Sequence, residues 1–190
     1  MSRLSTARSI ELAIRPETPL ERQLLATPEF REGLAWGEPR FGHPEGKVYL
    51  HVREVLDNIE RIPELDALSR ERLRLVAIAH DAFKYCEDRS NPRDWSRHHA
   101  AIARRFMEKH TSDRPVLDII ELHDDAYYAW RNARLEKPAP GYEHKTLEHL
   151  ISRVGYCLRL YYLFFKCDTQ TGDKTQASLK WFEKSVPSAL

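Results

Sequence analysis

The stretch SRERLRLVAIAHD, residues 69–81, indicates the fold more clearly than any other part of the chain. Its apolar residues recur at the three- and four-residue steps of a buried helix face, at Leu73, Val76 and Ala77. Ser69 is placed to cap the first turn, and the apolar face continues onto His80, with Asp81 one residue beyond. We therefore expect a helix that begins near Ser69 and carries an imidazole and a carboxylate into the interior.

Other segments repeat this arrangement of an apolar helix face joined to a polar group. A helix from Lys47 carries His51 within its face, and a later segment ends its face on His123. The last long helix, residues 147–165, is followed on the same face by Asp168. The apolar positions of the three faces are Val48, Val52, Val55, Leu56 and Ile59; Val116, Ile119 and Ile120; and Leu147, Leu150, Ile151, Val154, Leu158, Tyr161 and Phe165.

A fifth segment carries two adjacent histidines, His98 and His99, beside an apolar side formed by Trp95, Ile102, Ala103 and Phe106. Helical phase does not choose between the two imidazoles, because both lie close to that side. We expect one of the pair to face the interior.

The chain is predicted to form one all-α domain over its 190 residues. Proline-containing breaks at residues 15–19, 37–46 and 137–141 separate segments of helical period, and no convincing strand occurs. Residues 1–36 form an N-terminal helical extension of one or two helices. The expected architecture is a helical bundle with these additional N-terminal helices.

The composition excludes several classes of protein. Thirty Lys and Arg residues balance 29 Asp and Glu residues, so charge gives no reason to bind nucleic acid or an anionic membrane. No apolar run approaches the ~20 residues of a membrane span, and the N-terminus lacks the apolar core of a signal peptide. Three cysteines without CxxC spacing fit a reducing compartment, so we expect a cytoplasmic protein.

Five faces that each direct a His or Asp inward predict a metal ion. Each buried polar group without a partner costs several kcal/mol, and a shared cation would compensate all of them. Imidazole and carboxylate donors from distant segments exclude a zinc-finger knuckle but leave Fe, Mn, Co, Ni, Zn and Mg open. Because such an ion lowers the pKa of bound water toward ~7, hydrolysis is the chemistry expected. Motifs of several rival chemistries, including the P-loop, GxSxG and HExxH, are absent.

The order His51, His80-Asp81, Asp168 resembles the H…HD…D signature of the HD-domain phosphohydrolase superfamily. The resemblance covers residues 42–172, as an HD-type core. Within it, the run HPEGKVYLH, residues 43–51, is similar to the entry of the HD domain in bacterial tRNA nucleotidyltransferases, and HDAFK, residues 80–84, is similar to their HDxGK.

The resemblance implies a helical bundle that binds a divalent metal through His51, His80, Asp81 and Asp168. It implies that Asp81 also positions or deprotonates the attacking water, and that Lys84 stabilises a phosphoryl oxygen. A second metal would be held by His98 or His99 together with His123. Arg93 and Arg97, in the polar loop after the HD helix, are weaker candidates for binding phosphate.

The chain also departs from the families that it resembles. Phe83 replaces the glycine of HDxGK, and no nucleotidyltransferase domain fits upstream. The HDxxED pattern of guanosine tetraphosphate hydrolases and the GYP element of cyclic di-GMP phosphodiesterases are both absent. The expected activity is hydrolysis of a small phosphate ester, a nucleotide or cyclic nucleotide, as by a phosphodiesterase or other phosphohydrolase.

Two alternatives stay open from the sequence. One is a binuclear iron oxygenase on the HD fold, which the additional histidines would allow. The other is a non-catalytic, metal-stabilised module that binds a nucleotide or a partner. The sequence leaves the oligomeric state, the metal and the physiological substrate open.

Overall fold

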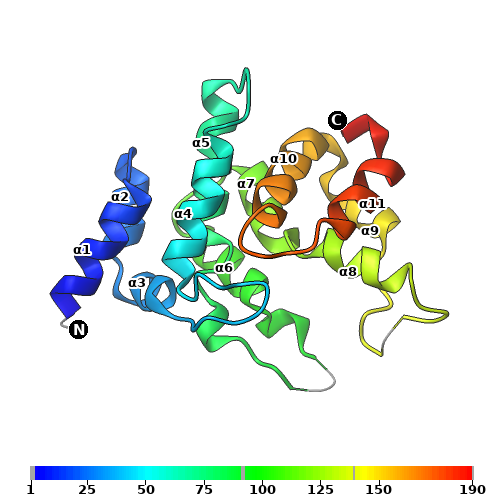
Figure 1. Cartoon of the computed structure of the whole chain (residues 1–190), viewed down its shortest axis with the longest axis horizontal. Coiled ribbons are helices and arrows are strands. Elements are labelled where there is room, and N and C mark those ends of the chain that lie inside the picture. Colours follow the sequence, from blue (N-terminus) through cyan, green and yellow to red (C-terminus); the bar gives the residue numbers. More distant parts are fainter. Residues whose placement is uncertain (1–2, 91–92, 139, 190) are drawn as a thin grey trace.

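The computed structural model describes residues 3–90, 93–138 and 140–189, and it confirms the all-α prediction. Within these ranges the regular structure is helical, and the only β-type pairing is an isolated bridge between Arg40 and His43. Figure 1 shows the N-terminal helices α1 to α3 at one end of the molecule and α8, α9 and α11 at the other. No helix in the described ranges is long and apolar enough to cross a membrane.

Helix α5 (Ala67–Ala79) lies at the centre of the bundle, because it packs against three helices that come from distant parts of the chain. These are α4 (Val48–Ile59), α7 (Arg114–Leu122) and α10 (Leu158–Thr169). Every residue of α5 from Leu73 to Ala79 is buried. The C-terminal end of this buried stretch matters for the site, since His80 directly follows it.

The beginning of α5 corrects the sequence prediction by one turn. The cap is Asp66 and not Ser69, and the Asp66 carboxylate accepts a hydrogen bond of 2.9 Å from the Ser69 backbone N–H. Asp and Ser are comparable caps, and the pattern of apolar residues does not distinguish between them. The buried face of the helix is unchanged by the difference.

The N-terminal extension forms three helices where one or two were expected: α1 (Arg3–Ile14), α2 (Pro19–Ala26) and α3 (Pro28–Ala35). Proline at the first position of both α2 and α3 favours a new start at each. Inside the bundle the extension makes a buried ion pair, in which the Arg74 guanidinium of α5 contacts the Glu21 carboxylate of α2 at 2.9 and 3.0 Å.

The predicted last long helix is divided into two. Helix α9 (Leu147–Val154) ends at a 3₁₀ turn, Gly155–Cys157, and α10 follows. Glycine is a poor helix former, which favours a break at Gly155. Within the 3₁₀ turn, the Tyr156 hydroxyl donates to the Asp118 carboxylate of α7 at 2.8 Å. The apolar pattern hid this break because buried residues continue on both sides of it.

The remaining helices complete the bundle around the site. Helix α6 (His99–Met107) packs on α7, and α8 (Asp125–Asn132) packs on both α9 and α11 (Ala177–Ser185). Two non-helical segments lie on the same side of the molecule, residues 37–47 before α4 and residues 170–176 before α11 (Figure 1).

Candidate metal centre

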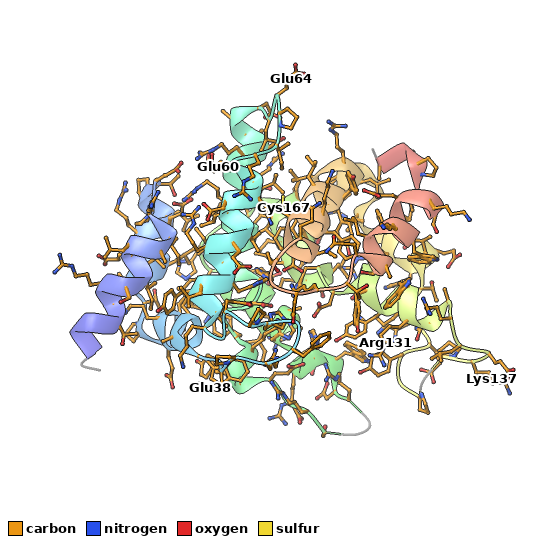
Figure 2. The ribbon with its side chains drawn as sticks, viewed as in Figure 1. Glu38, Glu60, Glu64, Arg131, Lys137 and Cys167 are labelled. Carbon is orange, nitrogen blue, oxygen red and sulfur yellow. The ribbon has the colours of Figure 1, made fainter. Side chains whose placement is uncertain are left out.

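The histidines and aspartates predicted from the separate helix faces converge in the structure. His51 comes from α4, His80 and Asp81 from the end of α5, His99 from α6, His123 from the end of α7, and Asp168 from the last turn of α10. In Figure 2 the label of Cys167 marks that last turn. The four imidazoles and Asp81 are each no more than 3% exposed, so they form a polar cluster inside an apolar bundle.

We call His51, His80 and Asp168 the first pole of this cluster. Asp168 Oδ1 lies 2.9 Å from His51 Nε2 and 3.8 Å from His80 Nε2. Asp81 Oδ2 faces the same space, 3.4 Å from His80 Nε2 and 3.8 Å from His51 Nε2. Donor atoms of the first pole all lie within 4.8 Å of one another, which is close enough to hold one metal ion.

Three of the four ring nitrogens of the first pole lack a hydrogen-bond partner. His80 Nδ1 is 2.9 Å from the Ala77 carbonyl, so its proton is donated there and the Nε2 lone pair faces the cluster. The buried atoms His80 Nε2, Asp81 Oδ1 and both ring nitrogens of His51 make no hydrogen bond of good geometry. Lone pairs and carboxylate oxygens that face each other inside a protein require a cation or a proton between them. The residues of the first pole therefore fit a divalent ion.

We call His99, His123 and Asp124 the second pole. Asp124 Oδ2 lies 3.4 Å from Nε2 of both His99 and His123, and the two Nε2 atoms are 3.3 Å apart. Asp81 Oδ1 approaches the same two nitrogens at 3.5 and 3.6 Å. His123 Nδ1 donates to the Ile120 carbonyl at 2.9 Å, so its Nε2 is the ring nitrogen that faces the cluster. Asp81 thus lies between the poles, with one carboxylate oxygen directed toward each.

Both members of the His98-His99 pair are buried, whereas we expected only one to face inward. His99 belongs to the second pole. His98 is the N-cap of α6, where its Nδ1 accepts from the Ala100 N–H, and its Nε2 lies 3.4 Å from Glu87 and 3.9 Å from Asp124. The kink at the helix start lets two neighbouring side chains point to the same side. His99 Nε2 lies 3.5 Å from Asp81 Oδ1, whereas the carboxylates near His98 are those of Glu87 and Asp124.

Two lysines face the cluster from a cavity of about 340 Å³ that opens beside it. Lys84 Nζ donates to Asp81 Oδ2 at 2.5 Å, and Lys174 Nζ donates to Asp168 Oδ1 at 3.1 Å. His80 and His123 also line this cavity. Carboxylates, imidazoles and two ammonium groups therefore line the same cavity. The cavity is large enough for a small ligand.

Several residues of the site carried no helical signal in the sequence. Glu45 accepts from His43 and lies 3.3 Å from His51 Nδ1, and Glu87 lies 3.5 Å from His99 Nδ1. Lys174 belongs to a loop whose Asp173 accepts from the Gly42 N–H at 2.6 Å. These residues occur in turns, where apolar periodicity gives no phase. The HPEG run was the only local signal, and it concerned Glu45 alone.

The pKa values follow the crowding of charge at the cluster. Burial opposes ionisation of Asp81 and Asp168, yet the neighbouring His80 and Lys84, or Lys174 and His51, hold both carboxyl pKa values well below the usual range. Burial also opposes protonation of His123, but Asp124 and Asp81 raise the pKa of this imidazole to about 9. The cluster is thus a place where positive charge is stabilised.

Three imidazoles, for which burial outweighs the neighbouring carboxylates, titrate in the opposite direction. Burial lowers the pKa of His80 and of His99. Burial and the adjacent His99 lower the pKa of His98 to about 3. These rings are neutral at pH 7, and neutral imidazole is the form that binds a metal.

The two arginines predicted as weaker phosphate ligands lie outside the cavity. Arg93 donates to Glu87 at 2.8 Å, and Arg97 pairs with Asp88 at 3.2 Å with most of its side chain exposed. Neither is among the residues that line the cavity. The positively charged side chains that line the cavity are those of Lys84 and Lys174.

No protein-family model matches this chain, and no curated protein or solved structure matches it.

Proposed function

We propose that this chain is a metal-dependent phosphohydrolase of the HD type, acting on a small phosphate ester such as a nucleotide or cyclic nucleotide. The observation that supports it is the set of buried ring nitrogens without hydrogen-bond partners at the first pole, from His51 and His80, beside the carboxylate of Asp81. With Asp168 they provide two imidazoles and two carboxylates, a mixed nitrogen and oxygen set that suits Fe, Mn, Co, Ni or Zn.

A divalent ion bound at the first pole would polarise a phosphoryl oxygen and lower the pKa of a coordinated water. Asp81 suits the positioning of that water more than its deprotonation, because His80 and Lys84 keep its carboxyl pKa low and make it a weak base, although burial acts against them. Its two oxygens face the two poles, which fixes its orientation.

Lys84 and Lys174 would bind the phosphoryl oxygens. Each ammonium is held by a carboxylate of the cluster, and each lines the cavity. Negative charge that builds up on the phosphate in the transition state would be stabilised by these fixed donors without reorganisation of water. A cavity of about 340 Å³ fits a small ester.

The second pole provides a second metal site in this proposal, with His99, His123, Asp124 and the shared Asp81. This arrangement also favours a second candidate function, a binuclear iron oxygenase, since imidazole-rich sites with a bridging carboxylate suit iron. Two equivalents of iron, visible colour and oxygen consumption would identify the oxygenase.

The proposal is tested by metal analysis of protein purified without added metal, followed by a panel of phosphomonoesters and cyclic nucleotides. We expect at least one equivalent of a transition metal, and turnover that falls at least a hundredfold in Asp81→Ala. The control is Asp57→Ala, which removes a half-exposed carboxylate of α4 that pairs with Arg53 outside the cluster. Turnover that survives in Asp81→Ala would disprove the catalytic assignment, and ligand-induced stabilisation without any product would identify a binding module.

A further inference from the structure

One face of α8 carries two aromatic and two basic side chains in a row that begins at the cavity. Tyr127, Trp130, Arg131 and Arg134 follow at positions i, i+3, i+4 and i+7, which places them on one side of the helix and its last turn. We call these four residues the α8 stripe. The opposite side of α8 presents the buried Ala126 and Ala129 to the bundle. Helix packing therefore leaves the stripe directed outward.

The stripe consists of flat groups that lie close to one another, with the two aromatic rings tilted and a guanidinium over each ring. The rings of Tyr127 and Trp130 have centroids 5.6 Å apart with planes at 38°. The Arg131 guanidinium lies over Tyr127 at 5.9 Å, and that of Arg134 lies over Trp130 at 5.0 Å. Tyr127 is 39% exposed and both arginines are exposed. Figure 2 labels Arg131 at the free edge of α8.

The charge of the stripe is not neutralised within the described part of the chain. No carboxylate there lies within ion-pairing distance of Arg131 or Arg134. Arg114 offers a contrast, since it lies over Tyr156 at 4.8 Å in the same kind of stack but also pairs with Asp118 at 3.3 Å. An aromatic and arginine pair elsewhere on the surface is thus satisfied internally, whereas the stripe has two guanidinium groups free for an anion.

The stripe is continuous with the proposed active site. Tyr127 lines the cavity together with Lys84 and Lys174, and Phe41, which is 89% exposed, stands on the same rim. A cavity of about 340 Å³ holds one nucleotide-sized group. A longer ligand bound there can extend past Tyr127, which is both a lining residue of the cavity and the first residue of the α8 stripe.

We propose that the α8 stripe binds the bases and backbone of a short single-stranded nucleic acid whose terminal phosphate enters the cavity. This inference rests on the proposed function and specifies its substrate as the end of an oligonucleotide. Aromatic rings stack on bases of any sequence, and arginine adds both stacking and phosphate contacts. The two lysines match the double negative charge of a terminal phosphomonoester.

The reaction so specified is hydrolysis of that terminal phosphomonoester. The oxygen of water forms a new bond to phosphorus while the bond from phosphorus to the sugar oxygen breaks. The sugar oxygen receives a proton, and the products are inorganic phosphate and an oligonucleotide with a free hydroxyl.

The near-neutral charge of the whole chain limits how many nucleotides take part. With a net charge of +1 overall and two arginines on the stripe, binding should involve about two backbone phosphates. For single strands this corresponds to a slope of about −1.4 in the logarithm of the binding constant against that of the salt concentration. A long nonspecific nucleic-acid groove is not expected.

The test compares substrates of increasing length that carry the same terminal phosphate. We expect kcat/KM to rise about tenfold per added nucleotide from the mononucleotide to the trinucleotide, the size of one stacked base. In Trp130→Ala, and in the double variant Arg131→Ala with Arg134→Ala, the ratio of trinucleotide to mononucleotide kcat/KM should fall toward one. The matched control is Arg114→Ala, which removes an arginine from the stack on Tyr156.

Binding of a fluorescently labelled trinucleotide, followed by anisotropy with and without added metal, tests the stripe when no turnover is found. Binding that the double variant weakens at least tenfold supports the proposal even then, so failure of the hydrolase assignment is distinguishable. Should Trp130→Ala not fold, the double variant alone decides. The proposal would be overturned if neither kcat/KM nor binding measured by anisotropy changed with the length of the oligonucleotide. It would also be overturned if the double variant changed only the oligomeric state, which would identify the stripe as an interface between copies of the chain.

Discussion

The two poles of the cluster use the same donor types but differ in how those donors are satisfied. At the first pole the ring nitrogens of His51 and His80 Nε2 have no hydrogen-bond partner. At the second pole His99 and His123 approach each other at 3.3 Å, and the pKa of His123 is raised to about 9 because Asp124 and Asp81 outweigh its burial. Burial and Lys174 oppose protonation of His51, yet Asp168 and Glu45 raise the pKa of this imidazole too. A proton can therefore be held at either pole, and the poles differ in the hydrogen bonds that their ring nitrogens make.

This difference indicates an order of metal affinity. An ion at the first pole meets three ring nitrogens without a hydrogen-bond partner, although Lys84 and Lys174 donate to the carboxylates there. An ion at the second pole must displace the proton of His123. We infer that the first pole fills first and that occupancy of the second pole depends on pH. Each prediction below tests this contrast or the residues around it.

The largest effect is expected from removing one imidazole of the first pole. His51→Ala should abolish stoichiometric metal binding and lower turnover at least a hundredfold, because it removes one of the two imidazole donors of the first pole. His123→Ala should retain one equivalent of metal and more of the activity. Metal content by mass spectrometry and turnover measure both, with His149→Ala, outside both poles, as control. Equal loss of metal in the two variants would contradict the order of affinity.

A smaller effect is expected from the carboxylates that orient the imidazoles. Glu45 lies 3.3 Å from His51 Nδ1, and Glu87 lies 3.5 Å from His99 Nδ1. Glu45→Gln should weaken metal binding about 10- to 100-fold at the first pole, and Glu87→Gln should affect only the second equivalent. Competition with a chelator gives the affinities, and Glu38→Gln, an exposed residue of the same turn (Figure 2), is the control. Equal metal affinities in Glu38→Gln and Glu45→Gln would contradict a role of Glu45 in orienting His51.

Lys174 tests whether the cavity beside the first pole binds phosphate. Lys174→Ala should raise KM about tenfold, the loss of one charged hydrogen bond to an anion, with a smaller change in kcat. Its metal content should not fall, because removing the ammonium relieves repulsion of a cation at Asp168. Steady-state kinetics beside Lys180→Ala, an exposed lysine of α11, gives the comparison. An unchanged KM would exclude this lysine from the substrate site.

The smallest effect concerns the pH dependence of stability in metal-free protein. Burial and His99 lower the folded-state pKa of His98 to about 3, below an unfolded value of about 6.5. The stability that neutral His98 contributes is complete above pH 6.5 and is lost as the pH falls toward 3. Between pH 6.5 and 5 the loss should be about 1.5 kcal/mol. Urea denaturation should show a shallower pH slope in His98→Asn, and parallel slopes would disprove the assignment.

Helical periodicity predicted those parts of the site that lie on regular elements. His51, His80 and His123 continue apolar faces, so their burial followed from the sequence, and Asp168 followed from the phase of the last helix. The break at Gly155 left that phase usable because the final part of the pattern, Leu158, Tyr161, Phe165 and Asp168, lies within α10 alone.

The residues that sequence did not predict lie where no period exists. Glu45, Glu87 and Lys174 are in turns and loops, and their positions depend on contacts between distant segments. The Gly42 N–H bonded to Asp173, 131 residues later, is such a contact. The cap of α5 was misplaced for a related reason, since Asp66 and Ser69 are equally suitable by residue type.

The ion pair of Arg74 with Glu21 has a consequence for shortened versions of the protein. Arg74 is 3% exposed and Glu21 is fully buried. A chain that starts after α2 would lose both Glu17 and Glu21 and would leave this guanidinium with Glu60, 3.8 Å away, as counter-charge. Removing one partner of such a pair costs about 3–5 kcal/mol. Arg74 also precedes His80 by six residues on the central helix. Trimming the first 26 residues should therefore disturb the candidate metal centre, although none of its residues lies in that stretch.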